Sequence, residues 1–205
     1  MLEILDTLRL GGWMMFPIVL ASIVSLAIIF EVGWLLARSE RQRDAWEEGD
    51  RAITRKGAPA DLFSRTMAWA LAHPEASPDA RQRFAAGALS AVERRVAWLN
   101  VIAAISPLFG LLGTVSGMIQ NFAKVAAVRP TDPLNELSRG ISEALVATAG
   151  GLVVAILAAL AHHALQNRLD AFADTLGSTL EGPLPSRQPR QPPAPVTAAE
   201  VAERG

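Results

Sequence analysis

The chain has 205 residues, a formal net charge of −1 and no cysteine, and 51% of its residues are hydrophobic against 19% charged. The absence of cysteine excludes disulfides, thiolate catalysis and cysteine-based metal sites. Three runs contain no Asp, Glu, Lys or Arg, at residues 10–30, 96–123 and 144–167. Each run reaches the roughly 20 residues that a helix needs to cross a bilayer. The alternative is three buried core helices of a soluble protein, but a chain of this size rarely holds three such uninterrupted runs. We therefore predict an all-α integral membrane protein.

The first transmembrane helix is expected at residues 13–36, after an N-terminal segment at 1–12. The flank MLEILDTLRL is mixed in charge and the apolar run is longer than 7–15 residues, so the segment does not fit a signal peptide. This span is bulky and has no stripe of small residues, which favours contact with lipid. Glu31, close to Trp34, is interpreted as an interfacial anchor at the end of the span.

Residues 37–95 are predicted to form a helical domain outside the membrane. The segment after span one mixes both charge signs and has few helix breakers, which is typical of a solvated helix continuing out of the span. Turns are expected at 57–59 and 73–78, where glycine and proline occur. The stretch RQRFAAGALSAVERRVAWLN then runs into span two without a break. The pattern predicts long helices that extend beyond the membrane.

The second span, at residues 96–123, has small and polar residues along one face. They recur at steps of three or four, with the adjacent Gly113 and Thr114 sharing one step: Ser106, Gly110, Gly113 or Thr114, Gly117 and Asn121. Helices associate in lipid where small residues allow close backbone approach, so we interpret Ser106, Gly110, Gly113 and Gly117 as a helix-packing face. Pro107 removes one backbone hydrogen bond and is expected to bend the span.

The third span, at residues 144–167, follows a segment at 124–143 that is expected to hold a loop and the start of the helix. Its own stripe of small residues is Ala144, Thr148, Gly151, Ala155, Ala159 and His162. The two smooth faces are expected either to pack on each other or to line a shared cavity. The hydroxyls of Thr114, Ser116 and Thr148 either bond their own helix backbone or serve a function on these faces.

Glu143 stands at the start of the third span. It is either a first-turn acid facing the positive end of the helix or a functional acid, since acidic residues inside membranes are costly and usually functional. We favour the hypothesis that Glu143 is a functional acid. His162 and His163 are adjacent, so they point to different faces and make a poor metal pair. No metal site and no cofactor is predicted.

The placement of positive charge predicts the topology. Ten Arg or Lys residues flank the spans within 37–95, against four on the other side: Arg9, Lys124, Arg129 and Arg139. Flanking positive charge tends to stay in the cytoplasm. We therefore expect residues 1–12 and 124–143 to be periplasmic and 37–95 to be cytoplasmic. A cytoplasmic helix at 168–181 and a disordered, Pro-rich tail at 182–205 complete the chain.

Several function classes do not fit this pattern. There is no Walker loop, nucleophile elbow or metal-ligand cluster, so we do not expect an enzyme. The basic residues follow the membrane flank and are interleaved with acids, which argues against nucleic-acid binding. No Asp, Glu, Lys or Arg lies near the middle of any span. A chain that relays protons by itself would normally place such a group there, so this chain either needs a partner to supply a carboxylate or does not conduct.

Two motifs resemble the MotA/TolQ/ExbB proton-channel family, and the ExbB/TolQ branch in particular. The first is ISPLFGLLGTVSGMIQNF at 105–122, and the second is GISEALVATAGGLVVAI at 140–156. The resemblance covers roughly residues 10–170. It implies a homopentamer in the bacterial inner membrane, with spans two and three around a central pore. It also implies an ExbD- or TolR-like single-span partner whose aspartate carries the proton, and a TonB- or TolA-like protein that receives the motion.

Carried over by motif, Thr114, Glu143 and Thr148 match the family's proton-path positions. The resemblance thus implies a proton-channel subunit of an ExbB–ExbD-type motor that energises TonB-dependent outer-membrane transport. Two alternatives stay open: a TolQ-like or gliding-type motor subunit with a different output, and a pentameric membrane scaffold that does not conduct.

Overall fold

The computed structural model describes residues 15–47, 61–128 and 132–182. These residues form the helices α2 (Met15–Glu47), α3 (Leu62–Ala72), α4 (Pro78–Val128) and α5 (Pro133–Glu181), with no strand among them. Helices α2, α4 and α5 are each long and apolar enough to cross a membrane. The predicted all-α fold with three candidate spans is therefore confirmed.

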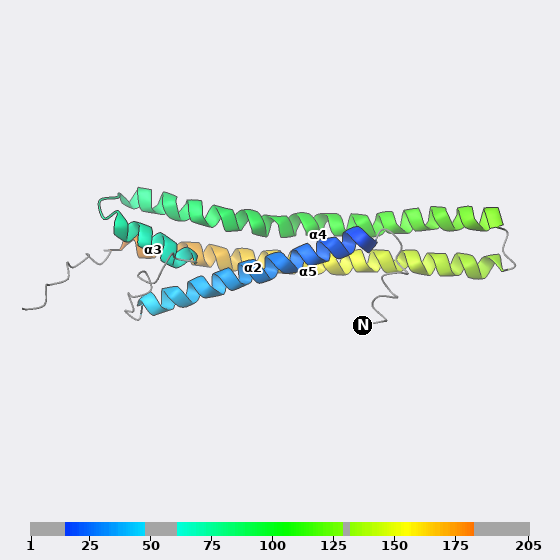
Figure 1. The fold of residues 1–205 in the computed structure, drawn as a ribbon, viewed down its shortest axis with the longest axis horizontal. Helices are drawn as coiled ribbons and strands as arrows, with labels where there is room; N and C mark the ends of the chain where they lie inside the picture. Colours follow the sequence, from blue (N-terminus) through cyan, green and yellow to red (C-terminus); the bar gives the residue numbers. More distant parts are fainter. Residues whose placement is uncertain (1–14, 48–60, 129–131, 183–205) are drawn as a thin grey trace, which may run out of the picture.

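Helices α4 and α5 form a long antiparallel pair (Figure 1). They contain 51 and 49 residues, so each is about 75 Å long, more than twice the thickness of the hydrocarbon core. Helix α2 crosses this pair obliquely, and its first turn lies near the middle of α5, where Met15 Cε is 3.7 Å from the position of a Cβ built on Gly150. The α4–α5 hairpin therefore continues well past the start of α2.

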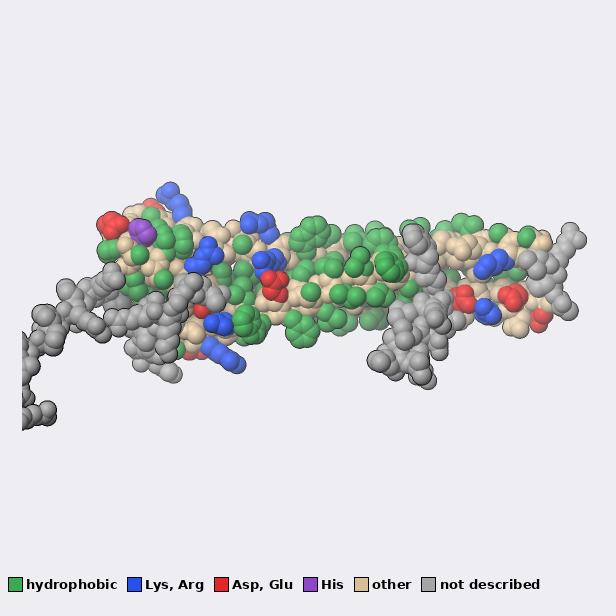
Figure 2. Space-filling model, in the orientation of Figure 1, with side chains coloured by type: hydrophobic (Ala, Val, Ile, Leu, Met, Phe, Trp, Pro, Cys, Tyr) green, Lys and Arg blue, Asp and Glu red, His purple; other side chains and the backbone are tan. Residues whose placement is uncertain are grey.

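Apolar side chains cover the middle of the visible surface, and charged side chains lie towards both ends (Figure 2). Many of the large apolar residues in this stretch are exposed, including Phe16, Phe30, Leu108, Leu111, Ile119, Leu152, Ile156 and Leu160. A soluble protein does not normally leave so large an apolar surface in water. The exposed apolar belt fits helices that are surrounded by lipid or by further membrane helices.

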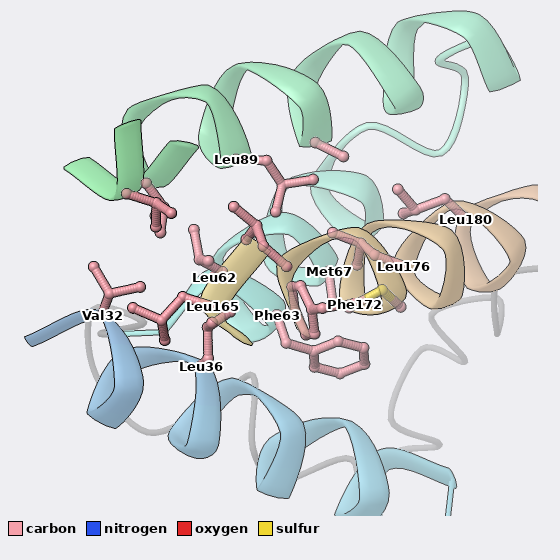
Figure 3. Packing of buried hydrophobic residues seen from close by; sticks show 14 of the residues in the cluster. Val32, Leu36, Leu62, Phe63, Met67, Leu89, Leu165, Phe172, Leu176 and Leu180 are labelled. Atoms are coloured by element: carbon pink, nitrogen blue, oxygen red, sulfur yellow. The ribbon is translucent and has the colours of Figure 1, made fainter. Parts of the chain in front are cut away.

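A hydrophobic core lies at the end of the molecule where α3 sits (Figure 3). All four helices contribute to it, with Leu36 from α2, Phe63 and Met67 from α3, Leu89 from α4 and Phe172 from α5. Each of these side chains is buried. The extensions of the long helices beyond the apolar belt are thus held together as a bundle, as expected from their sequence.

The short helix α3 is fixed to the long helices by polar contacts at its start. The Asp61 carboxylate caps the helix by accepting from the Ser64 backbone N–H at 2.9 Å. The Leu62 N–H donates to the Ser39 hydroxyl of α2 at 3.2 Å. At its other end, the Trp69 ring stacks on the Phe84 ring of α4 with centroids 4.4 Å apart. Helix α3 therefore closes the bundle between α2 and α4.

Ion pairs join α2 to both α4 and α5 at the charged end of the apolar belt. Glu31 pairs with Arg95 of α4, and Glu40 pairs with Arg168 of α5 at 2.7 Å. The position of Glu31, at the edge of the apolar belt, fits the interpretation as an interfacial anchor. Its specific partner on α4 was not apparent from the sequence.

The helices are longer than the expected spans. Helix α4 continues to Val128 and α5 already begins at Pro133, so much of the segment 124–143, expected to hold a loop, is helical. The early start of α5 has a local cause: Asp132 accepts from the Asn135 N–H at 3.1 Å, and Pro133 occupies the first turn. The expected turn at 73–78 is present between α3 and α4. The predictions for residues 1–12, 57–59 and the tail after 182 concern residues outside the described part of the chain.

Candidate functional site

The small-residue faces of α4 and α5 pack directly on each other. A Cβ built on Gly151 would lie 2.6 Å from the Ser106 carbonyl oxygen and 3.1 Å from Gly110 Cα. A Cβ on Gly110 would lie 2.9 Å from Thr148 Cα. Since real Cβ atoms do not approach backbone this closely, only glycine permits the observed distance between the two helices. We call this contact the α4–α5 seam. Of the two arrangements expected for the small-residue faces, packing on each other or lining a shared cavity, the structure has the packed one along these residues.

The seam continues towards the tip of the hairpin. A Cβ on Gly117 would lie 3.2 Å from Ala144 Cβ, and a Cβ on Gly140 would overlap the side-chain amide of Asn121. Gly113 is also buried. Ser106, Gly110, Gly117 and Gly151 thus lie at close approaches between α4 and α5.

The Thr148 hydroxyl crosses the seam and donates to the Gly110 carbonyl oxygen at 2.9 Å. In a continuous α-helix the same carbonyl also accepts from the Thr114 backbone N–H, four residues further on. Thr148 and the backbone of Thr114 therefore meet at one oxygen atom. The alternative that the Thr148 hydroxyl bonds a carbonyl of its own helix is wrong, because the hydroxyl donates to α4.

The Thr114 hydroxyl behaves differently. It donates to the Leu111 carbonyl oxygen of its own helix at 2.8 Å, and Ser116 donates in the same way to Gly113 at 3.3 Å. Such local bonds satisfy a hydroxyl inside an apolar environment without any partner helix. Thr114 is partly exposed, so its side chain remains accessible at the margin of the seam.

Glu143 lies on another side of α5. Its carboxylate accepts from Arg139 Nε at 3.2 Å, one helical turn earlier. Residues 143, 147, 150, 154 and 158 follow one another at steps of three or four and so form one stripe. Helix α2 packs on that stripe: Met15 and Ile18 share an apolar cluster with Ala147, Val154 and Ala158. Glu143 therefore continues the α2-facing stripe beyond the start of α2.

The structure thus brings two of the three predicted proton-path residues together and separates the third. Thr148 is five residues after Glu143, which turns it by about 140° around α5. On α4, Phe109 packs against the apolar cluster that contains Met15 and Ile18 of α2. Thr114 is five residues after Phe109 and so lies about 140° around α4 from it. Thr114 and Thr148 therefore share the side of the α4–α5 pair opposite α2, whereas Glu143 lies on the α2 side.

Pro107 lies inside α4, which continues through it as one helix. Its ring nitrogen has no hydrogen, so the Ala103 carbonyl oxygen loses its helical donor. Further along the pair, the His162 Nδ1 atom lies 3.1 Å from the Val96 carbonyl oxygen, which makes His162 an inter-helix contact. No group of three or more potential metal-binding side chains occurs among the described residues.

Sequence reasoning missed two contacts at this site. The Asn121–Gly140 contact was not predicted, although both residues lie in the quoted motifs. The Arg139–Glu143 pair was also missed, although the i, i+4 spacing is a recognisable signal.

These features are those of a multi-pass membrane protein with closely packed helices: an exposed apolar belt, three long helices and a glycine seam. Residues 45–177 match the MotA/TolQ/ExbB proton channel family. The chain is 32% identical to a putative biopolymer transport protein, ExbB-like 1, of Synechocystis sp., covering 98% of this chain and 88% of the relative. It is 30% identical to the Tol-Pal system protein TolQ of Pseudomonas aeruginosa, covering 79% of each chain. The biopolymer transport protein ExbB of Salmonella typhimurium is 39% identical over 42% of this chain and 39% of its own length.

The chain belongs to the MotA/TolQ/ExbB proton channel family, in its ExbB/TolQ branch. It is therefore a multi-pass protein of the bacterial inner membrane and a motor subunit of the ExbB/TolQ type. The family is one of membrane proton channels and not of enzymes.

Proposed function

We propose that this protein is the proton-channel subunit of an ExbB–ExbD-type motor that uses proton-motive force to energise TonB-dependent outer-membrane transport. The observation that carries the proposal is the meeting of Thr148 and Thr114 at the Gly110 carbonyl, on the side of the α4–α5 pair opposite α2. On that side the Thr114 and Thr148 side chains are both partly exposed, so a partner helix could contact them. Each proton that crosses the membrane releases roughly 2.3 kcal/mol per 100 mV of membrane potential.

In this proposal the chain assembles as a homopentamer around a central pore. Its partner is an ExbD- or TolR-like single-span protein, whose carboxylate supplies the titratable group that this chain lacks at mid-membrane. Thr114, Glu143 and Thr148 form the chain's own contribution to the proton path. A TonB- or TolA-like protein receives the resulting motion.

The proposed orientation has the N-terminus and the α4–α5 hairpin tip in the periplasm and the C-terminus in the cytoplasm. It rests on the ten positive residues that flank the spans within 37–95 against four on the other side. Six of the ten follow span one and four precede span two. A reporter fused after residue 130 should be active only if it folds in the periplasm, and a cytoplasmic signal there would overturn the orientation.

The test of conduction is proton flux into vesicles that contain the chain together with its ExbD-like partner. Thr148→Val and Glu143→Ala should each lower the flux at least tenfold while the complex still assembles. Thr175→Val is the matched control, because the Thr175 hydroxyl bonds only its own helix, at Ala171. Full flux in both site variants would remove these residues from the proton path.

A Tol-type output is a second candidate, because a TolQ protein matches this chain over most of its length. The two outputs are distinguished in a bacterial host that lacks its own motor subunits. Restored uptake of a TonB-dependent substrate favours the first candidate, and restored outer-membrane integrity without uptake favours the second.

A further inference from the structure

We propose that the surface shared by α2 and α4, at the α3 end of the apolar belt, binds the headgroup of an anionic phospholipid. Arg94 of α4 and Arg38 of α2 hold the lipid phosphate, and Trp98 and Trp34 contact the upper part of the acyl chains. The inference goes beyond the proposed function and does not depend on proton conduction. In the proposed orientation the lipid belongs to the cytoplasmic leaflet.

An exposed stripe on α2 changes from apolar to aromatic to basic where the belt gives way to charged side chains (Figure 2). Phe30, Trp34 and Arg38 follow one another at steps of four, so they lie on one face of the helix. Phe30 is 73% exposed, Trp34 is 63% exposed, and the Arg38 side chain is 43% exposed. The Arg38 guanidinium carbon lies 5.4 Å from the centre of the Trp34 ring, a cation–π contact. The stripe is therefore amphipathic along its length.

Helix α4 carries the same order of side chains in the opposite chain direction. Val101, Trp98 and Arg94 lie at steps of three and four, and all three are exposed. Trp98 is 61% exposed and Val101 is 43% exposed. In both helices, an arginine thus stands four residues from an exposed tryptophan, on the side away from the apolar belt. Two helices that run antiparallel present the same arrangement to their surroundings.

The distance from each tryptophan to its arginine matches the thickness of the lipid headgroup region. Four residues of an α-helix span about 6 Å along its axis. The polar region of a bilayer adds about 5–8 Å on each side of the hydrocarbon core. Tryptophan is enriched at the edge of that core, so an arginine one turn further out lies at the level of the phosphates. A free phosphate in solution has no use for the apolar half of the two stripes, whereas a phospholipid contacts both halves.

The ion pair between Glu31 and Arg95 brings the two stripes to one surface. The pair joins α2 to α4 at this level. Trp34 is three residues after Glu31, and Trp98 is three residues after Arg95, so each ring lies about 60° around its helix from the pair. Both stripes therefore adjoin the same contact between α2 and α4.

Arg94 has donors to spare for an anion. Its described contact is from Nη1 to the Ser90 hydroxyl at 3.5 Å, and no acidic side chain in the described part of the chain pairs with it. Arg38 Nε lies 4.0 Å from the Asp61 carboxylate, at the outer limit of an ion pair. Since a guanidinium has five N–H donors in a planar fork that fits a phosphate, both arginines retain donors for a headgroup.

The experiment measures how much lipid the purified full-length protein retains, by native mass spectrometry. The probes are palmitoyl-oleoyl phosphatidylglycerol and phosphatidylcholine with the same acyl chains. The wild type should retain phosphatidylglycerol in preference to phosphatidylcholine. Arg94→Gln and Arg38→Gln should each weaken phosphatidylglycerol binding about fivefold, which corresponds to the roughly 1 kcal/mol that one basic residue contributes near an anionic membrane surface. Arg94→Lys keeps the charge and should lose less than Arg94→Gln.

Arg83→Gln is the matched control. Arg83 is exposed on the same helix, 11 residues from Arg94 and so about 16 Å further from the belt. The substitution removes the same charge and should leave lipid retention unchanged. An equal loss in Arg83→Gln and Arg94→Gln would show attraction by overall charge, and would overturn a site at the tryptophans.

Two further outcomes would also overturn the inference. Inorganic phosphate should not displace phosphatidylglycerol, and full displacement at equal concentration would assign the surface to a soluble anion. The same spectra report the number of chains in the assembly. Fewer chains in Arg94→Gln, with unchanged lipid per chain, would show that a second copy covers the surface. If Arg38→Gln fails to fold because Asp61 loses its partner, Arg94→Gln decides alone, since its described contact is one serine hydroxyl.

Discussion

Thr148 and Gly110 require each other. The Thr148 hydroxyl donates to the Gly110 carbonyl oxygen at 2.9 Å. The two helices can come this close because Gly110 has no side chain; a Cβ at position 110 would lie 2.9 Å from Thr148 Cα. One residue supplies the hydrogen bond and the other supplies the room for it. The close approach of α4 and α5 is therefore built from a polar contact and a steric one at the same place.

The Thr148 contact should contribute measurably to stability. Thr148→Val keeps the shape of the side chain but loses the hydroxyl, and we expect it to lower the free energy of unfolding by about 1 kcal/mol, a typical value for a hydrogen bond between membrane helices. Thr148→Ser keeps the donor and should cost less. Unfolding of the protein in mixed micelles, followed by circular dichroism, measures both. Equal stability of Thr148→Val and wild type would show that the bond contributes nothing.

The seam glycines should not tolerate even a methyl group. Gly151→Ala would place its Cβ 2.6 Å from the Ser106 carbonyl oxygen, so we expect a loss of about 1–3 kcal/mol from overpacking. Gly87→Ala is the matched control in the same helix pair: Gly87 has nothing within 4 Å of an added Cβ, and alanine should stabilise the helix there by about 1 kcal/mol. Thermal unfolding of the two variants should move in opposite directions. A shift of the same sign in both would contradict the seam.

The contact between Asn121 and Gly140 should appear as a coupling between two substitutions. Gly140→Ala alone forces the Asn121 amide aside and should destabilise the protein by about 1–3 kcal/mol. In the background of Asn121→Ala the obstructing amide is absent, so the same change should be close to neutral. The double-mutant cycle measures this coupling. Additive effects would mean that the two residues do not meet.

The hydrophobic core formed by α2, α3, α4 and α5 around Phe63 should respond to truncation like the core of a globular protein. Phe63 is 1% exposed, and its ring meets the Trp46 ring edge-on with centroids 6.3 Å apart. Phe63→Ala should therefore cost about 3–5 kcal/mol. Leu134→Ala, at a side chain 78% exposed, should change stability by about 0.5 kcal/mol or less. Chemical unfolding monitored by tryptophan fluorescence compares the two, and equal losses would argue against this core.

Much of the architecture was predictable from local patterns. The three spans follow from uncharged runs longer than a bilayer requires, and the seam follows from small residues at steps of three or four. The first signal depends on composition and on the rise per residue of a helix, and the second depends on the helical period. The bulky residues of α5 outside its small-residue stripe are exposed, as at Leu145, Leu152, Ile156 and Leu160.

The extent of the helices was less predictable. The expected loop region at 124–143 is largely helical, because the Asp132 cap and Pro133 start α5 far outside the apolar run. Hydropathy marks where a helix is apolar and does not mark where it ends.

The sequence by itself determined that the chain crosses the membrane on helices and that α4 and α5 each carry a smooth face, because composition and a 3.6-residue period suffice for both. Only the tertiary structure decided which residues meet. It set Thr148 against Gly110, Asn121 against Gly140, and Glu143 on the side of α2, away from Thr148. The reason is physical: the side of a helix that a neighbour covers depends on how helices distant in the chain pack together. Residues five apart within one motif consequently face different partners.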